Sequence, residues 1–351
     1  MLQKKRDLVG IDIGSSSVKL VQLKEVRGGY QLVNLGMTPL PSDAIVDNAI
    51  MDSSAVVGAI RDLLLSLKIK EKNVASSVSG HSIIIRKIQM PIMTEEELES
   101  SIQWEAEQYI PFEISEVNLD FQILGPDVND SSQMNVILVA AKKDFVNDYV
   151  ALFKECGLNP VVMDVDCFAV ANVFEANYPV SDDEVVALID LGASSLNVNV
   201  LKGGMTVFTR DIQLGGNSYN EELQKRLGLN REDAEKVKLG GELPGVSANT
   251  VASVIEDATE VLTTDIQRSL DFFSASSADE RPKRIYITGG VSRVPAIRTS
   301  LAQRLGIDVQ VLDPWRQITS NKKTFDPDYL QSVGPLFTVA VGLAMRRVGD
   351  K

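Results

Sequence analysis

Apolar residues along this chain follow two alternating patterns: short runs typical of buried strands, and longer stripes with helical spacing. Helical stripes occur over 53–67 and 247–273, where they predict helices that face a core. Towards the C-terminus, runs and stripes alternate and predict strand 284–290, helix 295–305, strand 309–312 and helix 331–347. This mixture of strands and helices indicates an α/β fold.

One stretch of this pattern occurs twice. Residues 9–23 read VGIDIGSSSVKLVQL and residues 187–201 read ALIDLGASSLNVNVL, each with a strand, a turn of small residues and an alternating strand. Each copy then reaches a Gly-Gly turn and a third strand, over 30–35 in the first copy and 206–212 in the second. The copies begin about half the chain length apart. A unit repeated at half-length predicts two similar lobes that face each other.

Residues 91–160 interrupt this repeat. The stretch from Thr94 to Glu97 is a capping box, which predicts a helix that runs to Tyr109. Further on, the pattern predicts strands over 117–124 and 135–141 and a helix over 144–156. The segment is therefore predicted to be a small α+β subdomain inserted into the first lobe.

Composition narrows the class of protein. The 351 residues are 44% hydrophobic and 24% charged, which is typical of about two globular domains. The net charge of −13 argues against nucleic acid as a partner, because nucleic-acid binding relies on Lys and Arg. One histidine, His81, and two cysteines, Cys156 and Cys167, disfavour a histidine-rich metal site and a disulfide framework. No apolar run approaches the roughly 20 residues of a membrane-spanning helix, so we expect a soluble, cytoplasmic protein.

The turn in the first repeat copy carries candidate phosphate-binding chemistry. Tight turns of small residues expose successive backbone N–H groups, and Gly14 lets the chain approach a phosphate without a Cβ clash. Lys19 supplies a positive charge. Hydroxyl donors are available at Ser15, Ser16 and Ser17.

An aspartate precedes each turn, Asp12 in the first copy and Asp190 in the second. A carboxylate repels a phosphate, but it can hold the water shell of Mg²⁺, which keeps several waters when bound. Two such turns with two carboxylates between them predict a site for a nucleoside triphosphate with Mg²⁺. The alternative interpretation is a pair of ordinary β-hairpins with turn serines and with Lys19 as an exposed strand residue.

These motifs, in this order, resemble those of the actin-like ATPase superfamily. The resemblance implies a two-lobed, ribonuclease H-like fold that binds ATP and Mg²⁺ between the lobes. It implies a second phosphate motif and an adenosine motif at Gly192, Ala193, Ser194, Gly289, Gly290, Ser292 and Arg293. It also implies nucleotide contacts at Gly215, Gly216, Glu235 and Lys238. The implied catalytic residues are Asp12, Asp166 and Asp190, of which Asp12 and Asp190 hold the metal through water.

Simpler roles exist for some of these residues. Asp166, which falls where relatives place a Glu or Gln that positions the attacking water, could instead be a helix N-cap. Glu235 and Lys238 could be a solvated pair on one helix face. Because aspartate has a shorter reach than glutamate, we expect hydrolysis to be slow or regulatory.

The superfamily plan implies how the chain is divided. The inserted subdomain at 91–160 lies where FtsA carries one. The first lobe then comprises 1–90, together with 161–183 and the closing helix within 331–351. The second lobe comprises 184–330 and includes a helical, nucleotide-contacting part over 217–280.

Within the superfamily, residues 104–112, 117–121 and 164–169 resemble the PilM family of type IV pilus assembly proteins. The resemblance implies a cytoplasmic scaffold that is peripheral at the inner membrane without inserting into it. It implies a homo-oligomeric ring, contacts with the pilus motor ATPases, and a bound N-terminal peptide of PilN. In this family the peptide lies between the first lobe and the inserted subdomain.

The candidate peptide contacts are Trp104, Tyr109 and Phe112, although aromatic residues near a helix end are also typical of a subdomain core. Two alternatives remain for the function. One is an FtsA-like filament protein of cell division, and the other is a phosphotransferase or ATPase of the actin superfamily with true turnover.

Overall fold

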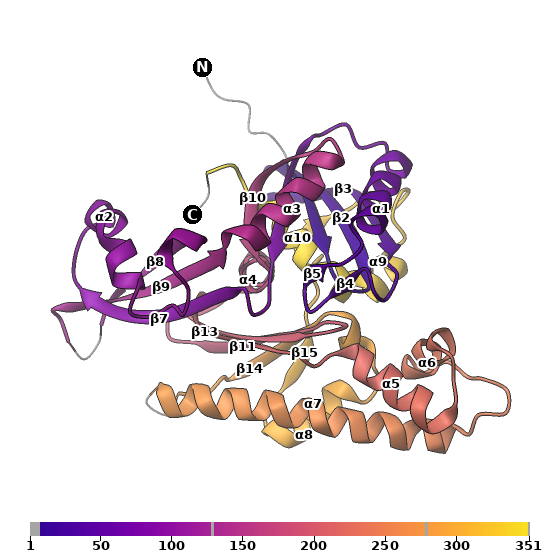
Figure 1. The fold of residues 1–351 in the computed structure, drawn as a ribbon. Helices are drawn as coiled ribbons and strands as arrows, with labels where there is room; N and C mark the ends of the chain where they lie inside the picture. Colours follow the sequence, from indigo (N-terminus) through magenta and orange to yellow (C-terminus); the bar gives the residue numbers. More distant parts are fainter. Residues whose placement is uncertain (1–7, 128–129, 278–279, 350–351) are drawn as a thin grey trace.

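The computed structural model describes residues 8–127, 130–277 and 280–349. Two lobes lie against each other, and a small subdomain projects from the side of one of them (Figure 1). Residues 1–7 and 350–351, which the predicted first lobe includes, lie outside the described residues. None of the helices in the described part of the chain has the length and apolarity needed to cross a membrane.

The first lobe is built on a six-stranded sheet. Its elements are β1 (Val9–Ile13), β2 (Ser17–Val26), β3 (Gly29–Pro39), β6 (Asn73–Val78), β10 (Asn159–Val165), β16 (Ile318–Thr319), α1 (Ser53–Ser66), α3 (Lys143–Glu155), α4 (Asp166–Asn177) and α10 (Thr338–Met345). The strand order is β10-β6-β1-β2-β3-β16, with β1, β2 and β3 antiparallel and with β6 and β10 added in parallel. Apolar residues of α1 and α3 form one core cluster with β1 and β2, whereas α4 and α10 belong to another.

The second lobe repeats this topology. Its elements are β11 (Val185–Leu191), β12 (Leu196–Lys202), β13 (Met205–Ile212), β14 (Arg284–Thr288), β15 (Val309–Val311), α5 (Gly216–Leu227), α6 (Arg231–Lys238), α7 (Ala248–Ser276), η2 (Gly290–Arg293) and α8 (Ile297–Leu305). The strand order β13-β12-β11-β14-β15 matches β3-β2-β1-β6-β10 of the first lobe, with the same senses. Helices α7 and α8 pack on this sheet. The prediction of two similar lobes is confirmed.

The projecting subdomain is a three-stranded antiparallel sheet, β7-β9-β8, packed against one helix. Its elements are β7 (Ile83–Pro91), α2 (Glu95–Ala106), η1 (Ile114–Glu116), β8 (Val117–Pro126) and β9 (Gln133–Lys142). The capping box at Thr94 is present, but α2 ends at Ala106 and not at Tyr109. Because β7 pairs with β9, and α3 packs in the first-lobe core, we propose 83–142 as the extent of the subdomain in place of 91–160.

Most predicted elements of the lobes are present, with ends shifted by up to four residues. The prediction of one continuous closing helix over 331–347 is wrong. The segment is divided into α9 (Pro327–Val333), η3 (Gly334–Phe337) and α10. The division turns the carbonyl of Pro335 towards the second lobe, where it accepts hydrogen bonds from Gly289 N and Thr288 Oγ1, both at 3.0 Å.

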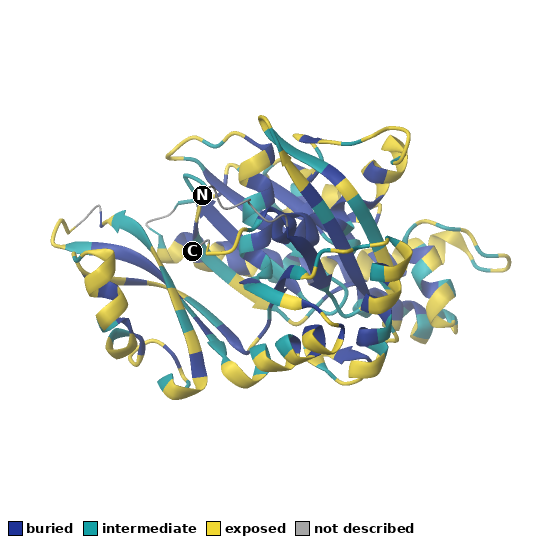
Figure 2. Cartoon of the chain, turned by 90° about the horizontal axis from the view of Figure 1, so that it is seen from above, coloured by how far each residue is buried: buried dark blue, intermediate teal, exposed yellow. Residues whose placement is uncertain are grey.

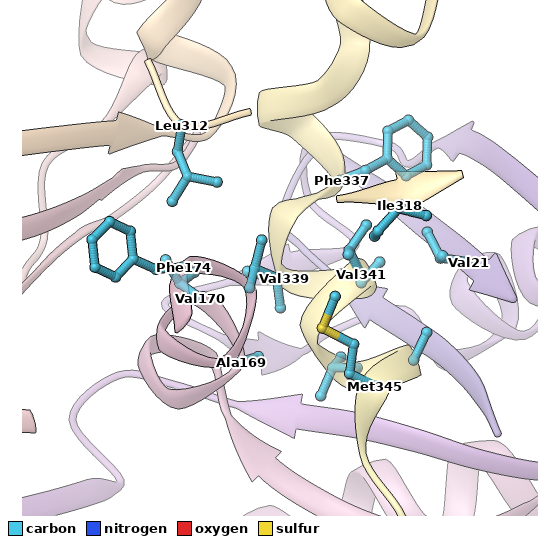
Figure 3. Packing of buried hydrophobic residues seen from close by; sticks show 14 of the residues in the cluster. Val21, Ala169, Val170, Phe174, Leu312, Ile318, Phe337, Val339, Val341 and Met345 are labelled. Atoms are coloured by element: carbon cyan, nitrogen blue, oxygen red, sulfur yellow. The ribbon is translucent and has the colours of Figure 1, made fainter. Parts of the chain in front are cut away.

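Helices α4 and α10 cross at very short range between the two sheets. A Cβ on Gly342 would lie 1.9 Å from the carbonyl oxygen of Ala169, so only glycine permits this crossing. The surrounding apolar side chains, among them Phe174 and Val339, come from several distant segments (Figure 3). Buried residues run through the strands and the helices between the sheets, whereas the outer helices carry many exposed ones (Figure 2). This packed crossing positions the two lobes relative to each other.

Candidate functional site

A cavity of about 220 Å³ lies between the two lobes, where the turns of the two repeat copies approach each other. Most of the predicted site residues line it. These are Asp12, Gly14, Ser15, Ser16, Lys19, Asp166, Asp190, Gly192, Ala193, Ser194, Gly216, Glu235, Lys238, Gly289, Gly290 and Arg293. Three predicted residues lie outside the lining, namely Ser17, Gly215 and Ser292, and each shapes a turn beside the cavity.

The first hairpin places a buried ion pair at the cavity wall. Asp12 and Lys19 face each other across the β1–β2 ladder, and Lys19 Nζ lies 2.9 Å from Asp12 Oδ2. Each of the two residues is 8% exposed. The interpretation of Lys19 as an exposed strand residue is therefore wrong. A Cβ on Gly14 would lie 3.2 Å from Lys19 Nζ, so the glycine leaves the ammonium group open to the cavity.

The second hairpin lacks the corresponding cation. The residue opposite Asp190 in the β11–β12 ladder is Asn197, whose amide donates to Thr209 Oγ1 and Asp211 Oδ1. Burial raises the pKa of Asp190 to about 7, and the charges of Asp166 and Asp12 add to the rise, which Lys19 opposes. Asp190 therefore lies in an acidic environment that a bound cation would relieve.

Asp166 is the first residue of α4, and the N-cap position belongs to Val165, which makes no side-chain cap. The alternative role of Asp166 as N-cap is therefore wrong. Its carboxylate accepts a hydrogen bond of 2.5 Å from Ser77 Oγ at the end of β6. Burial raises the pKa of Asp166 to about 6, the charge of Asp12 raises it further, and the bonds from Ser77 and Ser79 oppose the rise. The three aspartates thus share one end of the cavity.

A second charged group lines the other part of the cavity, on α6 and η2. Lys238 is 5% exposed, and its Nζ lies 2.5 Å from Glu235 Oε2 and 3.3 Å from the carbonyl oxygen of Gly216. The pair is thus not a fully solvated one, because its lysine is buried. Burial alone would raise the pKa of Glu235, but the hydrogen bond and the charge of Lys238 hold this pKa below its usual value. Arg231 and Arg293 also line the cavity and act electrostatically on Lys238.

Glycines bring the backbone close to the cavity at the ends of β14 and at the start of α5. Gly289 has φ +80, and a Cβ there would lie 2.5 Å from Asp190 Oδ1. Ser292 Oγ donates to the carbonyl oxygen of Gly289 at 2.6 Å and so fixes this turn. A Cβ on Gly215 would lie 2.6 Å from the carbonyl oxygen of Ala193, which packs the start of α5 against the second hairpin. These contacts leave backbone as the floor of the cavity.

The two hairpins touch each other across the cavity, where Ser194 Oγ donates to Ser15 Oγ. The residues present fit a metal–nucleotide complex: two glycine-rich turns, Lys19, and three carboxylates. A cation would lower the raised pKa values of two of these carboxylates, Asp166 and Asp190. Among the described residues there is no group of three or more acidic, His or Cys side chains that could hold a metal ion directly.

Several cavity residues were not found by sequence reasoning, namely Asn48, Ser77, Ser79, Tyr149 and Arg231. They come from a short hairpin, from the end of β6 and from helices α3 and α6, so no local motif unites them. The Asp-Asn pair between two short apolar runs was an available turn signal for the hairpin.

The peptide cleft is predicted between the first lobe and the inserted subdomain. A groove of about 650 Å³ there is lined by residues 107, 110–114 and 116 together with Lys142. Phe112 packs against the subdomain core and lies 4.3 Å below Lys142 Nζ. Trp104 is 74% exposed and Tyr109 38% exposed, so neither is a core residue.

Comparisons with known proteins are consistent with this geometry. The sequence matches the family described as type IV pilus assembly protein PilM over residues 10–348. A solved structure described as a PilM-PilN type IV pilus biogenesis complex is 31% identical, covers 99% of this chain and 100% of that chain, and has a TM-score of 0.88. Cell division protein FtsA of Bacillus subtilis is 22% identical over 382 residues, which span 95% of this chain and 82% of FtsA. MreB5 of Spiroplasma citri bound to AMPPNP is 13% identical, covers 97% of this chain and 95% of its own, and has a TM-score of 0.53.

Proposed function

The chain belongs to the PilM family of type IV pilus assembly proteins, and on this premise we propose that it is a nucleotide-binding scaffold that holds the N-terminal peptide of PilN. Its fold is the actin-like ATPase fold, as the resemblance implied. The single observation that carries the proposal is the match of 99% of the chain to the PilM–PilN complex at 31% identity.

We propose that ATP with Mg²⁺ binds in the cavity between the lobes. Lys19 and the backbone N–H groups of both turns would hold the phosphates, and Glu235, Lys238 and Arg293 would contact the nucleoside. The waters of Mg²⁺ would be oriented by Asp12 and Asp190, and the ion would supply the positive charge that offsets the phosphates. The raised pKa of Asp190, about 7, supports this role because a cation restores its ionised form.

We propose that nucleotide acts mainly by bridging the lobes. Each hairpin belongs to a different lobe, and the lobes meet at the crossing of α4 and α10, so a ligand bound by both hairpins favours their closed arrangement. Asp166 is held by Ser77 and is mostly ionised at neutral pH, which suits it to accept a hydrogen bond from a water. Its short side chain favours slow turnover.

The peptide of PilN is proposed to bind between the first lobe and the inserted subdomain. The subdomain would supply its side of this site through the groove beside Lys142, whose lining residues all belong to the subdomain and include the aromatic ring of Phe112. Trp104 and Tyr109 offer further exposed aromatic surface on the subdomain. A location peripheral to the inner membrane, a homo-oligomeric ring and contacts with the motor ATPases belong to the same proposal.

Calorimetric titration with a PilN-type N-terminal peptide tests this function. We expect the peptide to bind, with an affinity that Mg²⁺ and ATP change about fivefold or more, a normal size for coupling between two sites. Asp190→Ala should abolish the change and leave basal peptide affinity intact. Glu256→Ala, which removes an exposed carboxylate on α7, is the matched control. Absence of peptide binding would overturn the partner, and identical affinities with and without ATP would overturn the regulation.

The likeness to FtsA favours a second candidate, a filament protein of cell division. A pull-down that compares the PilN peptide with a division-protein tail discriminates the two. A steady-state phosphate-release assay tests the enzyme alternative, since release above ~1 s⁻¹ reaches the lower end of ordinary turnover. Asp166→Ala serves as its control.

A further inference from the structure

A short hairpin of the first lobe, β4 (Ile45–Val46) and β5 (Ala49–Ile50), reaches the cavity through its turn. The two turn residues, Asp47 and Asn48, have φ of +49 and +65. Left-handed backbone is uncommon for residues with a side chain, although Asn tolerates it. The turn therefore fixes the direction in which the Asn48 side chain leaves the backbone.

Two further contacts hold Asn48 in place. Tyr149 Oη, on α3, donates to the carbonyl oxygen of Asn48 at 2.9 Å. The Asn48 side-chain amide packs on Gly80, where a Cβ would lie 2.2 Å from Nδ2. Only a glycine at position 80 leaves room for this amide. Three separate segments thus position one side chain at the cavity wall.

The positioned amide has an unused donor. Within the described residues, Nδ2 of Asn48 is buried and has no hydrogen-bond partner. A buried polar group without a partner is costly, and such groups are found where an unseen ligand or water completes them. Asn48 Nδ2 therefore has a hydrogen bond to donate, and a bound ligand would supply the acceptor.

The location identifies the chemistry of that acceptor. Tyr149, which holds Asn48, interacts electrostatically with Asp166 and Asp12, so Asn48 lies at the aspartate end of the cavity. The opposite part, around Glu235 and Arg293, is the proposed nucleoside end. Because the nucleoside is proposed to lie in that opposite part, the terminal phosphate of a bound nucleoside triphosphate would lie at the aspartate end, next to Asn48.

We propose that Asn48 Nδ2 donates a hydrogen bond to the terminal phosphate and thereby makes the site prefer nucleoside triphosphate over diphosphate. The proposal rests on nucleotide binding in the cavity, as proposed above. Tyr149 acts as a positioning residue, since it holds the backbone of Asn48 from α3.

Calorimetric titration of Mg·ATP and Mg·ADP into wild type and Asn48→Gly tests the proposal. Glycine keeps the left-handed turn and removes the whole side chain with its amide. We expect about a tenfold or larger loss of ATP affinity, which is typical of a hydrogen bond to a charged group, and a change in ADP affinity within about twofold. Asn48→Asp should lose at least as much ATP affinity, because its carboxylate repels phosphate. Tyr149→Phe should lose less.

Asp47→Gly is the matched control, since it changes the neighbouring left-handed residue, which is exposed. Its ratio of ATP to ADP affinity should equal that of wild type. An unchanged ratio in Asn48→Gly, or an equal loss of ATP and ADP affinity, would overturn this inference alone. Wild-type protein that binds neither nucleotide would overturn the proposed nucleotide site and this inference with it.

Discussion

The two repeat hairpins share a sequence pattern and a backbone topology, but their aspartates lie in opposite electrostatic environments. Asp12 is paired with Lys19 at 2.9 Å in the first hairpin. Asp190, its counterpart, is opposite Asn197 in the same ladder position. The first carboxylate is neutralised by the protein, whereas the second depends on what binds in the cavity.

The difference arises from one side chain on the second strand of each hairpin. Asn197 donates its amide to Thr209 and Asp211 on β13 and brings no charge to Asp190. Asp211 is itself an acid whose pKa burial raises, so this hairpin gathers negative charge. The first copy of the motif thus supplies a fixed cation, Lys19, whereas the second copy leaves Asp190 available to a cation that can bind and leave.

The largest effect is expected from breaking the first pair. Lys19→Met removes the ammonium group, keeps most of the stem and leaves Asp12 buried without its partner. Removing one member of a buried pair typically costs about 3–5 kcal/mol, and we expect a loss of this size in the free energy of unfolding at neutral pH. Urea denaturation of the nucleotide-free protein measures it. The control Lys24→Met changes an exposed lysine on the same strand and should cost under about 0.5 kcal/mol.

In the second hairpin, removing a charge is expected to raise the free energy of unfolding, whereas in the first hairpin it lowers it. The folded pKa of Asp190, about 7, exceeds the unfolded value of 3.8, so the folded state binds more protons between these pH values. The free energy of unfolding should therefore fall as pH rises from about 4 to about 7. Asp190→Asn should remove this penalty and stabilise the nucleotide-free protein at pH 7.5 by up to about 4 kcal/mol, at about 1.4 kcal/mol for each unit of the pKa rise. The pH dependence of urea denaturation measures both effects.

Asn197→Lys sharpens the same test by giving the second hairpin a cation. Its ammonium group would stand opposite Asp190, lower the pKa of that carboxyl and flatten the upper part of the pH profile. A remaining slope below pH 6 is expected from Asp166, whose pKa is about 6. A profile in Asp190→Asn that matches wild type would contradict the assignment of this titration to Asp190.

The repeat made much of the fold predictable from sequence. Ile-Asp-x-Gly followed by small residues occurs twice, so the equivalent positions of Asp12 and Asp190 followed without knowledge of packing. The ion pair of Lys19 did not follow, because cross-strand register and burial decide it. Asn48 and Tyr149 were missed, since the β4–β5 turn and α3 meet only in the tertiary structure. The break in the closing helix at Gly334 and Pro335 was also missed, because a hydrogen bond from Gly289 of the second lobe stabilises it.

The smallest effect is expected from the contact between the hairpins. Ser194 of the second hairpin donates to Ser15 of the first hairpin. The position equivalent to Ser15 in the second hairpin is Ala193, which has no hydroxyl group, so this hydrogen bond has no symmetric counterpart. Because a neutral hydrogen bond is worth about 0.5–1.5 kcal/mol and this one is part-exposed, Ser194→Ala should cost under about 1 kcal/mol in the free energy of unfolding. It should also speed nucleotide association, since phosphates must displace this contact to reach both turns. Stopped-flow binding of a fluorescent ATP analogue measures the rate, and Ser253→Ala, which changes an exposed serine on α7 away from the cavity, is the control. Equal rates in all three proteins would mean that the lobes open without first releasing this bond.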